Sequence, residues 1–91
     1  MSVSRENQVA LAREIKSLID SNKENAAVLA HAYELAKVAL GMLENEEDSI
    51  NIGFELQEYA YEHLEIAEGK TETPVWISHN DAAIRKVIES T

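Results

Sequence analysis

Residues 26–43 have the sequence AAVLAHAYELAKVALGML, and this stretch decides the fold class. Alanine and leucine dominate it, and because both are strong helix formers it predicts one long helix. Apolar side chains cover most of the helical circumference, and the polar strip is confined to Glu34, Lys37 and Gly41. One neighbouring helix cannot cover so wide an apolar face, so we expect a central helix that is shared with a second copy of the chain. The two charges at its middle argue against a membrane span.

Apolar spacing and capping signals predict helices on both sides of this stretch. Apolar residues recur at helical spacing after Ser4, which favours a first helix. Ser21, followed three residues later by Glu24, resembles a capping box at the start of the central helix. Asp48 or Ser49 can cap a third helix in the same way.

Glycine and proline mark the end of the third helix and the residues after it. Gly69 stands where a C-terminal glycine belongs, and residues 71–74 (Thr-Glu-Thr-Pro) break the helix. We expect residues 75–77 to be extended, and Ser78 resembles the N-cap of a short last helix. The predicted helices cover about residues 5–20, 23–43, 49–68 and 79–89.

These elements predict an all-α fold, with no pair of strands that could form a sheet. We expect a small antiparallel bundle of three main helices plus a short C-terminal helix, in a single domain of residues 1–91. Dimerisation is expected to complete it, since a chain of 91 residues has difficulty removing this much apolar surface from water by itself.

The net charge of −9 is concentrated in one part of the chain. Residues 44–69 hold nine acidic side chains and no basic one, whereas the segments before and after them are each balanced. A pI near 4.6 argues against direct binding of nucleic acid, because phosphate contacts need clustered lysine and arginine. The charge fits a basic protein partner, such as a nucleic-acid-binding protein, or solubility alone.

The third helix has two faces of different character. Its five glutamates fall within one sector, with Phe54 and Tyr61 projecting among them, and no lysine follows any of these glutamates at i+4. Aromatic anchors and carboxylates could dock on a basic protein or imitate a row of phosphates. A charged outer face can also be merely solvated, and Trp76 can pack on the bundle or contact a partner. The predicted partner-binding residues are Phe54, Glu55, Glu58, Tyr61, Glu62, Glu65, Glu68 and Trp76.

No motif predicts an enzyme. The absence of cysteine excludes disulfides, a thiol nucleophile and a thiolate metal site. His31 and His63 lie on apolar faces, where core or interface histidines are expected rather than metal ligands, and the Glu-x-x-His motif of di-iron bundles is absent. The sequence Glu-Gly-Lys-Thr of residues 68–71 matches only the end of a phosphate-binding loop. We therefore expect no catalytic residue, metal ion or cofactor, and a cytoplasmic location without membrane contact.

In size, acidity and helical character, the chain resembles small phage- or prophage-encoded proteins that inhibit host nucleic-acid enzymes, some by imitating DNA. Residues 69–82, with Ser78 and His79 ahead of a short helix, are similar to the C-terminal toxin-binding part of some bacterial antitoxins, although this chain lacks their basic N-terminal DNA-binding element. The sequence therefore leaves three candidate functions. They are an inhibitor or adaptor that docks its acidic third helix on a basic partner, a structural homodimer with a solvated acidic face, and an antitoxin-like binding protein.

Overall fold

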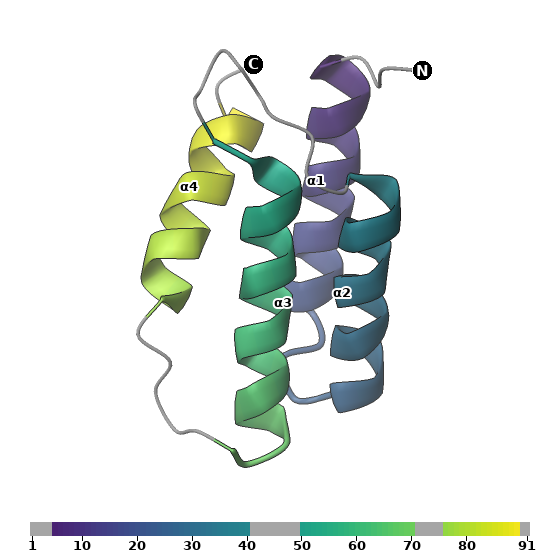
Figure 1. The fold of residues 1–91 in the computed structure, drawn as a ribbon, viewed down its shortest axis with the longest axis vertical. Helices are drawn as coiled ribbons and strands as arrows, with labels where there is room; N and C mark the ends of the chain where they lie inside the picture. Colours follow the sequence, from purple (N-terminus) through teal and green to yellow (C-terminus); the bar gives the residue numbers. More distant parts are fainter. Residues whose placement is uncertain (1–4, 41–49, 71–75, 90–91) are drawn as a thin grey trace.

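The computed structural model describes residues 5–40, 50–70 and 76–89, and it confirms an all-helical fold. Within these residues the helices are α1 (Arg5–Asp20), α2 (Ala26–Ala39), α3 (Ile52–Ala67) and α4 (Ile77–Glu89). Successive helices run in opposite directions (Figure 1). Helices α1 and α3 each pack against all the other helices, whereas α2 and α4 lie on opposite sides of the bundle and do not pack against each other.

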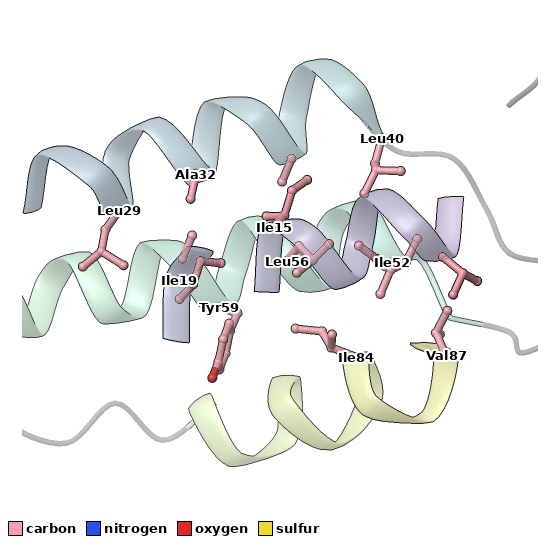
Figure 2. Close-up of a cluster of buried hydrophobic side chains, with 14 residues drawn as sticks. Ile15, Ile19, Leu29, Ala32, Leu40, Ile52, Leu56, Tyr59, Ile84 and Val87 are labelled. Carbon is pink, nitrogen blue, oxygen red and sulfur yellow. The ribbon is translucent and has the colours of Figure 1, made fainter. Parts of the chain in front are cut away.

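The core lies between the four helices and is built from one apolar stripe of each (Figure 2). Because these stripes recur at three- and four-residue spacing, each helix turns one continuous apolar face inward. The buried apolar residues are Val9, Ala12, Ile15, Ile19, Leu29, Ala32, Ala36, Leu40, Ile52, Leu56, Tyr59, Ala60, Ile84 and Val87.

Helix α2 begins later than its sequence predicts, because Asn25 is its N-cap. The Asn25 side chain accepts a hydrogen bond from the backbone N–H of Val28 at 3.2 Å. The predicted capping box is wrong because Ser21 belongs to the end of α1, where its hydroxyl donates to the carbonyl of Ser17 at 2.7 Å. The predicted end of this helix, at residue 43, lies outside the described residues.

Helix α3 has well-formed caps at both ends. Asn51 accepts a hydrogen bond from the N–H of Phe54 at 2.9 Å, so it caps the helix, while the predicted caps at residues 48 and 49 lie outside the described residues. At the other end Gly69 has φ +75°, which confirms its predicted place. The N–H groups of Gly69 and Lys70 return to the carbonyls of Ile66 and Glu65, which is the Schellman arrangement.

Helix α4 is longer than predicted and begins two residues earlier. Its 13 residues compare with 14 in α2, so the expectation of a short last helix is wrong. The carbonyl of Trp76 accepts the N–H of Asn80 at 2.8 Å, which places Trp76 at the N-cap position. Ile77 is therefore helical rather than extended, and Ser78 is not the cap. The predicted break at residues 71–74 lies outside the described residues.

Candidate functional site

Helix α4 packs against α3 and covers part of its acidic side. The five glutamates were expected on one exposed face, but Glu62 is only 7% exposed and its expected exposure is wrong. The side chain of Glu62 accepts a hydrogen bond from the backbone N–H of Trp76, at the start of α4. Glu55, Glu58 and Glu65 are half-buried, while Glu68 is exposed. A helix that packs against this side of α3 is the physical reason for the difference.

In two of these glutamates, burial disfavours the ionised carboxylate and raises the pKa. Burial raises the pKa of Glu62 against the opposing hydrogen bond from Trp76, and the charges of Glu58 and Glu65 add to the rise. Burial also raises the pKa of Glu55, although the charge of His79 opposes it. Among the described residues, the Oε2 atoms of Glu55 and Glu62 are buried without a hydrogen-bond partner. These two side chains are therefore less suited to direct docking than the other three.

A groove of about 230 Å³ lies between α2 and α3, and we call it the aromatic groove. The Phe54 and Tyr61 side chains are 44% and 49% exposed, which confirms that they project outward from α3. Across from them, the Tyr33 ring of α2 lies 6.1 Å from the Tyr61 ring between centroids, at an interplanar angle of 53°. The groove is lined by Tyr33, Phe54, Gln57, Glu58 and Tyr61.

Carboxylates beside this groove lack basic partners. Within residues 5–40, 50–70 and 76–89, no lysine, arginine or histidine forms an ion pair with Glu58 or Glu65. Glu68, in contrast, pairs with Lys70 at 3.4 Å. Aromatic rings and carboxylates that have no basic partner among the described residues therefore meet on the outward side of α3, and Tyr33 of α2 lies beside them.

Trp76 is 56% exposed, but it does not line the aromatic groove. Its ring makes an edge-to-face contact with the His79 ring, with centroids 5.7 Å apart. Its backbone N–H is held by Glu62, so the residue is tied to α3 through its main chain and leaves much of its indole in solvent.

A second group of charged side chains, which we call the polar cluster, joins α1, α3 and α4. Lys16 is only 5% exposed, and its Nζ atom lies 2.8 Å from Asp20 Oδ2 and 2.9 Å from Asp81 Oδ1. The hydroxyl of Tyr59 donates to Asp20 Oδ1 at 2.7 Å, and Arg85 pairs with Asp81 at 2.8 Å. This cluster was not predicted from the sequence, because Lys16 and Asp81 are 65 positions apart and the spacing of Lys16 and Asp20 alone indicates an ordinary surface pair.

The polar cluster favours the charged forms of Lys16, Asp20 and Asp81 and the neutral form of Tyr59. Burial by itself would lower the pKa of Lys16, but its hydrogen bonds to Asp20 and Asp81 outweigh burial and raise it. Burial by itself would raise the pKa values of Asp20 and Asp81, but the hydrogen bonds from Lys16 and from Tyr59 or Arg85, together with the nearby positive charges, lower them. Burial and the hydrogen bond to Asp20 raise the pKa of Tyr59. Each of these charges is thus paired within the cluster, which links α1, α3 and α4.

The histidines differ from one another in burial. His63 is buried, its ring lies 4.7 Å from the Tyr59 ring in an edge-to-face contact, and burial lowers its pKa. His31, which was expected in the core or at an interface, is exposed on α2 and so is not a core residue of the single chain. Among the described residues there is no group of three or more histidine, aspartate or glutamate side chains that could hold a metal ion. None of the described helices is long and apolar enough to cross a membrane.

The aromatic groove and its neighbouring carboxylates thus form an exposed aromatic and acidic surface between α2 and α3, whereas the polar cluster joins α1, α3 and α4. No family model, curated protein or solved structure matches this chain.

Proposed function

We propose that this chain is a non-enzymatic binding module that holds a basic segment of a partner protein on the outward side of α3. The observation that carries the proposal is the meeting of exposed aromatic rings, Phe54 and Tyr61, with the carboxylates of Glu58 and Glu65, which form no ion pair within the described part of the chain. Aromatic side chains supply much of the energy of protein interfaces, and complementary charge supplies steering and specificity. If the partner binds nucleic acid through the same basic segment, its occupation by α3 inhibits that activity by occlusion.

Burial reduces the number of predicted partner-binding residues that can touch a partner directly. Phe54, Glu58, Tyr61 and Glu65 form the contact surface, and Glu68 extends it toward the end of α3. Glu55 and Glu62 contribute long-range negative potential, because their carboxylates are partly or wholly covered. Trp76 is the centre of a separate exposed surface at the start of α4.

The test compares two double variants with the same change in net charge. Glu58→Gln with Glu65→Gln neutralises the proposed surface, whereas Glu6→Gln with Glu14→Gln neutralises two exposed glutamates on α1. Each tagged protein is used to capture proteins from a lysate of its source cells at low salt, about 50 mM, where surface charges are weakly screened. The captured proteins are then eluted at high salt.

We expect the unmodified chain and the α1 variant to retain the same basic protein, which high salt releases. The α3 variant should retain at least about tenfold less of it, since loss of two charge contacts at an interface commonly costs more than 1.4 kcal/mol. Equal retention by the two variants, or retention of no basic protein by the unmodified chain, would contradict the proposal.

A specific observation also favours the second candidate, a homodimer formed through α2. The Val38 side chain on this helix is 81% exposed, and Ala27, Ala30 and Leu35 are exposed on the same helix. A second copy could cover this surface, and the acidic side of α3 would then serve solubility. An antitoxin-like function has no such support, because Ser78 and His79 lie inside α4 rather than ahead of it.

A further inference from the structure

We infer that the aromatic groove is a binding site for one cationic side chain, an arginine guanidinium or a lysine ammonium, carried by the basic segment of the partner. This inference rests on the proposed function and goes beyond it, because it assigns a ligand group to a defined set of residues. The groove has a volume of about 230 Å³ and is open to solvent between α2 and α3.

Rings from two helices surround the groove. Phe54 and Tyr61 are two helical turns apart on α3, with Glu58 between them on the same side, and Tyr33 of α2 lies across the groove beside Tyr61. The faces of aromatic rings carry negative potential and attract cations within about 6 Å of the ring centroid. Since Phe54 and Tyr61 are each nearly half exposed, their rings are accessible to a side chain that enters from solvent.

The charges around the groove favour a cation over a neutral apolar group. Glu58 lines the groove and has no basic partner among the described residues. Among the described residues, the lysine that lies over an aromatic ring is Lys16, whose Nζ atom is 5.4 Å from the Tyr59 ring centroid. This contact belongs to the polar cluster and not to the aromatic groove. Lys37 follows Tyr33 by one turn on α2, but it is exposed and does not line the groove. An incoming cation therefore finds both aromatic faces and an unpaired carboxylate.

The other occupants of such a groove would use different chemistry. A leucine or phenylalanine side chain would gain from the rings but would bury the Glu58 carboxylate without a partner, which is costly. A second copy of the chain would bring further negative charge to an already acidic surface, since the net charge per chain is −9. A basic side chain satisfies both the rings and the carboxylate.

The experiment uses the full chain and two small peptides of equal shape. Acetyl-Gly-Arg-Gly-amide is titrated while the aromatic C–H resonances of the protein are followed by NMR, and the same peptide with citrulline replaces the guanidinium by a neutral urea. We expect saturable shifts of the Tyr33, Phe54 and Tyr61 resonances with the arginine peptide. The citrulline peptide should bind at least about fivefold more weakly, because it loses both the cation–π attraction and the charge pair.

Three single variants assign the site. Tyr61→Leu removes one ring but keeps apolar bulk, and Glu58→Gln removes the charge, so each should weaken the arginine peptide at least about threefold. Trp76→Leu removes an exposed aromatic ring outside the groove and should leave the titration unchanged. The backbone amide spectrum of each variant establishes that it is folded.

Equal binding of the arginine and citrulline peptides would overturn the inference, as would titrations that respond to Trp76→Leu rather than to Tyr61→Leu. If a basic protein is captured through Glu58 and Glu65 while the arginine peptide does not bind, the inference fails and the proposed function stands. If the arginine peptide binds as expected while no basic protein is captured, the cation site is supported and the protein-binding function fails.

Discussion

Lys16 shows how one buried charge can position a helix that lies far away in the sequence. Its ammonium group is shared between Asp20 on its own helix and Asp81 on α4, and the Tyr59 hydroxyl of α3 completes the arrangement. Removing two charges from water costs free energy that their attraction must offset, so such a group specifies a geometry more than it adds stability. Here it specifies where the first turns of α4 lie against α1 and α3.

Replacing Lys16 by Met should destabilise the fold, because Asp20 and Asp81 lose their shared cation. We expect a loss of about 2–3 kcal/mol in the free energy of unfolding at pH 7, somewhat below the cost for a fully buried pair, since both carboxylates are about one-third exposed. Urea unfolding followed by circular dichroism measures it. Lys37→Met, which removes an exposed lysine, is the control and should change stability by less than about 0.5 kcal/mol.

The pH dependence of the same variant gives an independent check. In the unmodified protein the pKa values of Asp20 and Asp81 are lowered below 3.8, so these groups contribute stability above that pH and lose it as the pH falls. The difference between Lys16→Met and the unmodified protein should therefore shrink as the pH falls toward 3. A difference that stays constant with pH would mean that lost packing, and not lost pairing, explains the effect.

At the scale of the helices, α4 depends on a carboxylate of α3 for its N-terminal end. The first turn of α4 contains no acidic residue, and the backbone N–H of Trp76 is accepted by Glu62 instead. An acceptor at this place satisfies an N–H that the helix itself cannot pair, and a negative charge there interacts well with the helix dipole. The cost is burial of a carboxylate next to Glu58 and Glu65.

Glu62→Gln should stabilise the protein at pH 7, because the amide oxygen still accepts from Trp76 while the buried charge is removed. The pKa of Glu62 is raised above 4.5 in the folded state, so its contribution to stability is present at low pH and is lost as the pH rises through that raised value. We expect a gain on the order of 1 kcal/mol at pH 7 that disappears near pH 4. Urea unfolding at several pH values measures it.

Two further variants control this prediction. Glu65→Gln makes the same change in charge at a half-buried position and should have a smaller effect. Glu62→Leu removes the acceptor for Trp76 as well as the charge, so it should be less stable than Glu62→Gln by about 1–3 kcal/mol. Equal stabilities for Glu62→Gln and Glu62→Leu would show that the hydrogen bond to Trp76 does not support α4.

At the scale of the whole molecule, α2 also exposes apolar side chains, among them Leu35 and Val38, away from the core. If a second copy covers them, the chain should associate as its concentration rises, and sedimentation velocity from low to high micromolar concentration should show a monomer–dimer equilibrium. Val38→Glu places a charge at the most exposed apolar side chain of α2 and should keep the chain monomeric.

Ala82→Glu makes the same change in charge at an exposed position on α4, so it should associate like the unmodified chain. A monomer at every concentration for the unmodified protein would exclude the α2 dimer. It would leave the binding of a basic segment at α3 as the proposed function, because the aromatic groove lies between α2 and α3 within one chain.

Local signals in the sequence were sufficient to predict the helices and some of the residues at which they end. The apolar spacing of each helix predicted its existence, and Gly69 was predicted at its place because only glycine adopts a positive φ readily. Ser21 was assigned to the wrong role, since a serine near a helix end can bond to the turn behind it as readily as to the turn ahead. Ser78 was assigned to the wrong role because α4 begins at Ile77, with the Trp76 carbonyl as the acceptor at the N-cap position. Phe54 and Tyr61 were predicted to face outward, and they do.

The sequence by itself thus determined that the chain is helical, where its charge is concentrated and which residues of each helix are apolar. These properties depend on hydrogen bonds and side-chain spacings within a few residues. Only the tertiary structure decided that α4 covers Glu62, that Lys16 meets Asp81, and that Tyr33 meets Tyr61. Which flank of a helix is covered depends on how it packs against helices that are distant in the sequence, so the candidate site could be only partly predicted from residues of α3 alone.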